Sequence, residues 1–182
     1  RSASYLLNDS ALVLQVPGRP SGARRVWAAG LQGGFRNMDT AAAYRNEGAL
    51  RQALPPYGLD PDEIFLTTKC FNDDHGYDKA KRACKASLER LELTHLDLYL
   101  IHWPVAGKFK DTWRALEKLY ADGRVRAIGV SNFLQHHLEE LMTEAKVKPM
   151  VDQLEFHPWL VQPELQAYCR QHGIQYQAWS PL

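Results

Sequence analysis

Short apolar runs alternate with amphipathic stretches along most of the chain. Runs rich in β-branched and aromatic residues predict six strands, at 35–39, 64–70, 96–103, 125–132, 150–156 and 175–182. Residues 10–16 predict a less regular first strand, and the Pro- and Gly-containing segment 17–22 predicts a turn or loop. Repeated strand–helix units at this spacing are typical of α/β proteins with a parallel sheet, which is either open or closed into a barrel.

The stretches between the strands repeat apolar residues with the period of an α-helix. The expected buried faces are Ala80, Ala83, Cys84, Ser87, Leu88 and Leu91; Trp113, Leu116, Leu119 and Tyr120; Leu134, Leu138, Leu141 and Met142; and, more weakly, Leu165, Tyr168 and Cys169. Asp111 is the expected N-cap of the helix that contains Trp113, and Gly123 is its expected C-terminal stop. Residues 24–31 predict a further helix.

The composition indicates an ordinary soluble protein and narrows the classes of partner. The chain has 182 residues, of which 45% are hydrophobic and 24% charged, and its formal net charge is +1. Neither a nucleic-acid partner nor a membrane partner is therefore expected, and no apolar run is long enough to span a bilayer. Three cysteines without CxxC spacing favour a reducing, cytoplasmic location and argue against a structural metal site.

Polar residues stand where one strand after another ends. No GxGxxG motif follows the first strand, so the open dinucleotide-binding sheet lacks its fingerprint. In parallel barrels, by contrast, catalytic residues come from the carboxyl ends of several strands. The residues at or just after the expected strand ends are Asp39, Tyr44, Lys69, His102, Ser131, Asn132, Gln153, Glu155, Trp179 and Ser180.

Four of these residues make chemical sense as one set. A nearby lysine is expected to lower the pKa of a tyrosine, and an aspartate can hold that lysine. A histidine can donate a hydrogen bond to a carbonyl oxygen. Asp39, Tyr44, Lys69 and His102 therefore predict a proton donor with its supporting groups. Taken singly, each would be interpreted as a solvated, salt-bridged or structural residue.

Six segments together resemble the aldo-keto reductase superfamily. They are MDTAAAYRNE (38–47), FLTTK (65–69), LDLYLIHWP (96–104), VRAIGVSNF (125–133), VDQLEFHP (151–158) and AWSPL (178–182). The likeness runs from about Phe35 to the last residue. Segments 108–133 and 136–141 make it closest to bacterial-type reductases of the glyoxal and methylglyoxal kind.

The resemblance implies a (β/α)8 TIM barrel that uses NADPH to reduce aldehydes and ketones. Tyr44 would be the general acid, Lys69 its activator, Asp39 the partner of Lys69, and His102 the group that orients the carbonyl. Trp103 would line the substrate pocket. Residues implied to bind the cofactor are Asp39, Ser131, Asn132, Gln153, Trp179, Ser180 and Leu182, with Trp179 stacked on the nicotinamide. No metal is implied, and the family is largely monomeric.

The chain departs from the family pattern at three places. The Leu-Gly-Xaa-Gly stretch of the first strand is missing from residues 7–18, and Asp152 stands where Asn is common beside the nicotinamide. The chain also stops on the expected seventh strand, whereas complete barrels have about 250 residues. We therefore expect residues 1–182 to form one barrel domain that is C-terminally incomplete, with segments of a longer protein omitted. A true truncation would fold weakly and show little activity.

Three classes of function are compatible with the barrel. The leading prediction is an NADPH-dependent reductase of small 2-oxoaldehydes such as methylglyoxal. The alternative is a weak or inactive barrel that binds a cofactor or another protein. The intact set of Asp39, Tyr44, Lys69 and His102 argues against that alternative, whereas the missing cofactor loop argues for it. A phosphate-binding isomerase is a third class, but the chain has no glycine-rich phosphate loop.

Overall fold

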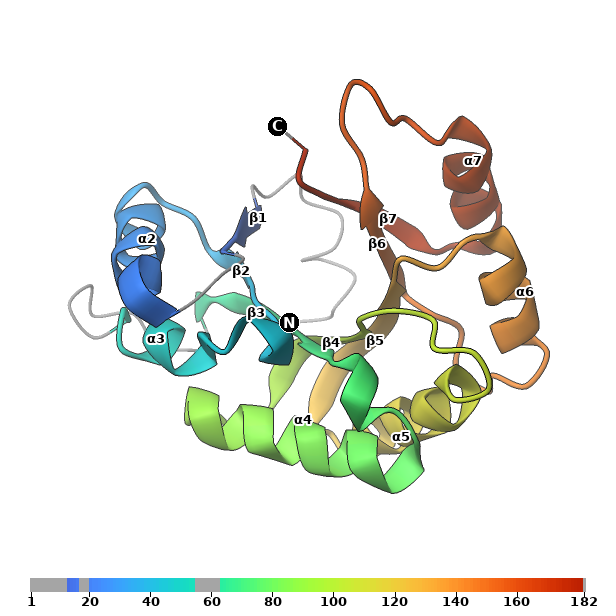
Figure 1. The fold of residues 1–182 in the computed structure, drawn as a ribbon, viewed down its shortest axis with the longest axis horizontal. Coiled ribbons are helices and arrows are strands. Elements are labelled where there is room, and N and C mark those ends of the chain that lie inside the picture. The colour runs from blue at the N-terminus through green and yellow to red at the C-terminus, as the bar shows by residue number, and fades with distance from the viewer. Residues whose placement is uncertain (1–12, 17–19, 55–62, 182) are drawn as a thin grey trace.

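Seven parallel strands form a nearly closed barrel with helices outside it (Figure 1). The computed structural model describes residues 13–16, 20–54 and 63–181. In chain order its elements are β1 (Val13–Gln15), α2 (Pro20–Gln32), β2 (Asn37–Asp39), η1 (Ala42–Tyr44), α3 (Glu47–Arg51), β3 (Phe65–Cys70), η4 (Asn72–Asp74), α4 (Tyr77–Leu91), β4 (Leu96–Ile101), α5 (Phe109–Ala121), β5 (Val125–Ser131), α6 (Gln135–Met142), β6 (Val151–Glu155), α7 (Pro163–His172) and β7 (Gln175–Trp179). Each strand pairs in parallel with the next, so the predicted parallel α/β barrel is confirmed.

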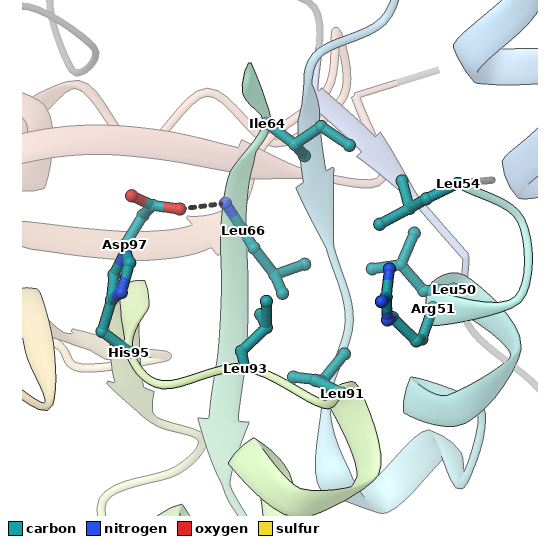
Figure 2. Close-up of a pocket in the computed structure, with 9 residues that line it drawn as sticks. All are labelled: Leu50, Arg51, Leu54, Ile64, Leu66, Leu91, Leu93, His95 and Asp97. Atoms are coloured by element: carbon teal, nitrogen blue, oxygen red, sulfur yellow. Dashed lines mark hydrogen bonds between the residues drawn. The ribbon is translucent and has the colours of Figure 1, made fainter. Parts of the chain in front are cut away.

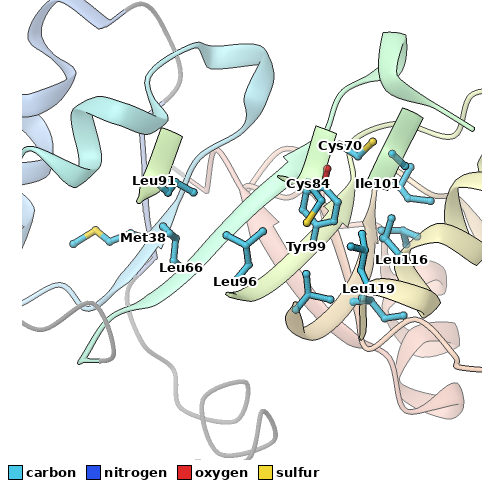
Figure 3. Close-up of a cluster of buried hydrophobic side chains, with 14 of the residues drawn as sticks. Met38, Leu66, Cys70, Cys84, Leu91, Leu96, Tyr99, Ile101, Leu116 and Leu119 are labelled. Atoms are coloured by element: carbon cyan, nitrogen blue, oxygen red, sulfur yellow. The ribbon is translucent and has the colours of Figure 1, made fainter. Parts of the chain in front are cut away.

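Two apolar layers stabilise this arrangement. The larger one lies between the sheet and the helices, where Met38 and Leu66 lie near Leu91 of α4 and Ile101 lies near Leu116 of α5 (Figure 3). A smaller layer fills the barrel interior and consists of Phe65, Leu98, Leu100, Ala127 and Val151. Because side chains alternate across a strand, one face of each strand packs against helices and the other fills the barrel.

Gly129 lies at a point of the interior that leaves no room for a side chain. A Cβ atom at this position would lie 2.5 Å from the carbonyl oxygen of Val151 and 2.8 Å from Leu100 Cδ2. Only glycine fits such a close backbone approach. The neighbouring strands β5 and β6 are therefore held close together just below their carboxyl ends.

The predicted helices form, with corrections at their ends and edges. Helix α2 begins at Pro20, so the predicted loop at 17–22 is wrong for its last residues. Proline suits the first helical turn because its missing N–H would have no partner there. Helix α5 begins at Phe109, which places Asp111 in its first turn and makes Lys108 the N-cap. Gly123 follows the C-cap with a φ of 69°, as its predicted role as a stop requires.

Two residues expected in the core are exposed instead. Tyr120 is 36% exposed because it lies in the last turn of α5, where Leu119 takes the buried position. Leu134 is 45% exposed because it is the N-cap of α6 and precedes the face formed by Leu138 and Leu141. The missing Leu-Gly-Xaa-Gly stretch involves residues that lie mostly outside the described part of the chain. No helix in the described ranges combines the length and apolarity needed to cross a membrane.

Candidate active site

A polar cavity opens at the carboxyl ends of the strands, above the apolar layer inside the barrel. Its volume is about 190 Å³. Most of the lining residues come from strand ends: Gln15, Tyr44, Lys69, His102, Trp103, Ser131, Asn132, Gln153, Trp179 and Ser180. Residues of β1 and β7 therefore border the same cavity, although they are 164 or more positions apart in the chain. Asp39 lies beneath it and is fully buried.

Asp39 and Lys69 form a buried ion pair inside the barrel. Lys69 Nζ donates a hydrogen bond to Asp39 Oδ1, and the side chains of Lys69 and Asp39 are 1% and 0% exposed. Lys69 Nζ also donates to the carbonyl oxygen of Thr40, at 3.2 Å. Two amides complete the shell of the carboxylate: Gln153 Nε2 donates to Oδ2 at 2.6 Å and Gln15 Nε2 donates to Oδ1 at 3.3 Å. Buried charges persist when they are paired and hydrogen-bonded in this way.

Tyr44 ends the short helix η1 and borders the cavity beside this pair. Lys69 Nζ lies 5.6 Å from the centre of the Tyr44 ring. Burial raises the pKa of Tyr44 to about 12, and the negative charge of Asp39 adds to the shift. The net shift is therefore upward and not downward as expected from Lys69 alone, because burial and the charge of Asp39 both raise the pKa. At neutral pH the phenol keeps its proton.

His102 directly follows β4 and faces Tyr44. Its backbone N–H donates to the carbonyl oxygen of Cys70 at 3.1 Å, which continues the ladder between β3 and β4. The rings of His102 and Tyr44 meet edge to face, with centroids 5.9 Å apart. Burial lowers the pKa of His102 to about 4, and the positive charge of Lys69 contributes. The imidazole is therefore neutral at pH 7, and its buried Nδ1 finds no hydrogen-bond partner among the described residues.

The ends of β5, β6 and β7 are joined by side-chain hydrogen bonds. Trp179 Nε1 donates to Asn132 Oδ1 at 3.0 Å, and Asn132 Nδ2 donates to the carbonyl oxygen of His102 at 3.0 Å. Ser131 Oγ donates to the carbonyl oxygen of Gln153 at 2.8 Å. Asn132 is thus occupied by contacts within the protein. Within the described ranges, Gln153 Oε1 is a buried acceptor that lacks a donor.

The remaining residues predicted for the site lie at the rim of the cavity. Trp103 is 45% exposed and Ser180 lies beside Trp179. Leu182 lies outside the described residues. Glu155 borders a neighbouring groove of about 570 Å³, which shares Trp103, Asn132 and Trp179 with the cavity. The polar strand ends therefore gather at one end of the barrel, as the pattern of the sequence predicts.

Gln15 and Gln177 were missed in the sequence, although both contribute to this polar layer. Gln177 Oε1 accepts a hydrogen bond from Gln153 Nε2 at 2.9 Å, and Gln15 contacts Asp39. The signal for Gln177 is the alternation of Gln175, Gln177 and Trp179, which places every second residue on the inner face. Asp152, where Asn is common in the family, lies on the outer face of β6 and does not line the cavity.

A second cavity lies near the opposite, amino ends of the strands (Figure 2). Its volume is about 30 Å³, and most of its lining is leucine and isoleucine. Asp97 at its edge is already engaged, because its Oδ2 accepts a hydrogen bond from the backbone of Leu66 at 2.9 Å. This space suits a water molecule and not a substrate. In residues 13–16, 20–54 and 63–181, no three His, Cys, Asp or Glu side chains are grouped to hold a metal ion.

Residues 19–182 match the sequence profile of the Aldo/keto reductase family. The chain belongs to this family. It is 56% identical to the glyoxal reductase of Bacillus subtilis over 154 residues, which are 85% of this chain and 56% of that protein. The chain therefore spans about half the length of the curated relatives it matches.

Solved structures of family members share the fold. The aldo/keto reductase of Brucella melitensis matches with a TM-score of 0.91 at 41% identity, over 94% of this chain and 68% of that one. An aldo-keto reductase of Bombyx mori, solved in complex with NADP, matches with a TM-score of 0.89 at 29% identity. That match covers 94% of this chain and 62% of that one. The described fold is thus shared with these family members.

Proposed function

We propose that the protein uses NADPH to reduce aldehydes and ketones to alcohols, with small 2-oxoaldehydes such as methylglyoxal as substrates. The observation that carries this proposal is the convergence of a protonated Tyr44, a neutral His102 and the Asp39–Lys69 pair at one cavity. The relationship to glyoxal reductase supports the substrate class. A nicotinamide cofactor is supported by the family and by the NADP complex of its silkworm member.

The cavity fits the nicotinamide end of such a cofactor. The carboxamide of nicotinamide carries an NH₂ donor, and Gln153 Oε1 is a buried acceptor that lacks one. Trp179 lines the same cavity and offers an aromatic surface for the ring. Ser131 and Asn132 hold this wall through their hydrogen bonds to Gln153, His102 and Trp179.

The side chains around the cavity divide the proton chemistry between them. The cofactor, when bound, supplies the hydride that reaches the carbonyl carbon and is thereby oxidised. Tyr44 Oη gives its proton to the carbonyl oxygen, so the product is an alcohol and Tyr44 becomes a phenolate. His102, being neutral, orients the carbonyl by donating an N–H to its oxygen. Lys69 stabilises the phenolate until solvent returns the proton, and Asp39 keeps Lys69 in place.

The test is NADPH consumption by the purified protein with methylglyoxal, compared between the parent, Tyr44→Phe and Tyr120→Phe. Tyr44→Phe removes the donated proton, and we expect kcat to fall by about 10²–10⁴-fold. Tyr120→Phe makes the same change at a tyrosine on the outside of α5, and we expect parent activity. Turnover in Tyr44→Phe at the parent rate would refute the role of Tyr44. NADPH binding without turnover in the parent would refute the reductase and support the binding-module alternative.

A further inference from the structure

The turn that carries Tyr44 is anchored by side chains that face away from the cavity. Glu47 begins α3, three residues after Tyr44, and its side chain is 1% exposed. Its Oε1 accepts a hydrogen bond from Thr68 Oγ1 at 2.7 Å, and its Oε2 accepts one from Arg90 Nε at 2.6 Å. Arg90 reaches this carboxylate from α4. A buried carboxylate with a partner on each oxygen is held in one position.

Thr68 connects this anchor to the strand that presents Lys69. The two residues are neighbours on β3, so their side chains point to opposite faces of the sheet. Lys69 points into the barrel, towards Asp39, whereas Thr68 points outward, towards Glu47. The hydrogen bond between Thr68 and Glu47 therefore ties the segment after Tyr44 to the strand that carries Lys69.

Asn46 makes a second connection beside the first. Its fully buried side chain accepts a hydrogen bond from Thr40 Oγ1 at 2.6 Å and donates to the carbonyl oxygen of Val16 at 2.8 Å. Thr40 is itself a contact of Lys69, which donates to its carbonyl oxygen. We call Thr40, Asn46, Glu47 and Thr68 the outer clamp.

The backbone shows why this turn needs such support. Arg45, between Tyr44 and Asn46, has a φ of 55°, in the left-handed region that non-glycine residues rarely adopt. Conformations of this kind persist only where the surroundings hold them. The outer clamp fixes the residues that follow Arg45 and thereby the direction in which the chain presents Tyr44.

We infer that Glu47 and Thr68 are positioning residues, which fix the phenol of Tyr44 relative to Lys69 and His102 through the outer clamp. The inference rests on the proposed role of Tyr44 as proton donor. Neither residue lines the cavity, so both act through the turn and the strand that they join. A small displacement of a catalytic group can reduce the rate by about 10²-fold.

Thr68 permits a sharp test because valine has nearly the shape of threonine and lacks the hydroxyl. We expect Thr68→Val to lower kcat by about 10–100-fold while KM for methylglyoxal stays within about threefold. Thr68→Ser keeps the donor and should restore most of kcat. Thr67→Val is the matched control, because the adjacent Thr67 hydroxyl is buried and makes no hydrogen bond to the described residues. Thermal melting of each variant shows whether it is folded.

A second readout does not depend on activity. In protein labelled with 3-fluorotyrosine, the ¹⁹F resonance of Tyr44 is the one that Tyr44→Phe removes. We expect this resonance to shift or broaden in Thr68→Val and to stay unchanged in Thr67→Val and Thr68→Ser. A Tyr44 resonance that is unchanged in a folded Thr68→Val protein would overturn the inference, as would a kcat within twofold of the parent. If the parent is inactive, the proposed function fails and the ¹⁹F result alone decides the inference.

Discussion

The inner and outer faces of the barrel treat a buried carboxylate in opposite ways. Asp39, on the inner face, is fully buried and receives hydrogen bonds from Lys69, Gln15 and Gln153. Asp152, on the outer face of β6, is equally buried, but neither of its carboxylate oxygens has a hydrogen-bond partner of good geometry among the described residues. Burial therefore raises its pKa well above the usual value, and only the backbone amide of Phe133 opposes the shift.

The difference shows what a polar group in this sheet requires. On the inner face, one positive charge and two amides surround Asp39, so the ionised form persists without access to water. On the outer face, Asp152 lies near Cys169 and Tyr176, which carry no positive charge and keep their protons because burial raises the pKa of each to about 12. The inner carboxylate is thus a paired ion, and the outer one is best accommodated as a neutral acid.

The largest expected effect comes from breaking the inner pair. Asp39→Asn leaves the Lys69 ammonium buried without a counter-charge, so we expect the free energy of unfolding to fall by about 3–5 kcal/mol. Activity should be lost with it. Urea unfolding of the purified variant measures the change. Adding Lys69→Met should restore most of the stability but none of the activity.

The matched control for this change is Asp122→Asn. Asp122 forms an exposed ion pair with Lys118 on α5, and such pairs contribute at most about 1 kcal/mol. A loss from Asp39→Asn no larger than the loss from this control would show that the inner pair is not the strong element described above.

A smaller effect of opposite sign is expected on the outer face. The pKa of Asp152 in the folded protein lies well above the ordinary value of 3.8. Between these two pKa values, the folded state therefore binds more protons than the unfolded chain. Its contribution to stability is therefore complete below about pH 4 and is lost as pH rises through the folded-state pKa. Asp152→Asn imitates the neutral acid, and we expect it to stabilise the protein by about 1–3 kcal/mol at pH 8.

Unfolding curves at pH 5 and pH 8 check this expectation. The gain from Asp152→Asn should be larger at pH 8 than at pH 5, whereas Asp73→Asn, at an exposed site, should show no such difference. A loss of stability in Asp152→Asn at pH 8 would mean that Asp152 is an ion with partners, as Asp39 is.

The smallest effect tests how much each donor to Asp39 contributes. Gln15→Leu removes one hydrogen bond of 3.3 Å, and we expect a loss of about 0.5–1.5 kcal/mol in urea unfolding. Gln175→Leu, at an exposed position of β7, is the control. Equal stability of the two variants would show that Lys69 and Gln153 alone are sufficient for Asp39.

The sequence predicts the barrel well because the spacing of hydrophobic residues along a helix or strand indicates which of its faces is buried. Strand β3 appears close to its expected ends, and the buried face of α4 is largely the predicted one. Tyr120 was misjudged because period alone does not show where a helix runs past the sheet. Asp111 was misjudged because the helix begins two residues earlier, at an aromatic residue with no capping signal.

The site was only partly predictable, since a sequence shows which residues end strands but not how their charges combine. The polar strand ends gather as expected, yet the pKa of Tyr44 moves upward, because burial disfavours the phenolate and the negative charge of Asp39 adds to the shift. The contribution of Gln15 depends on a contact with Asp39 across 24 positions. Asp152 is buried close to Cys169 of α7, a proximity between distant segments that no local pattern reveals.

Gly129 gives the mouth of the barrel a fixed width. The backbones of β5 and β6 touch at this glycine, and Ser131 and Gln153 project into the cavity two residues further along each strand. The close approach of β5 and β6 at Gly129 therefore limits how far apart Ser131 and Gln153 can lie. The spacing of the two strands on this side of the cavity is thus fixed by the close approach at Gly129 and by the hydrogen bond from Ser131 Oγ to the carbonyl oxygen of Gln153.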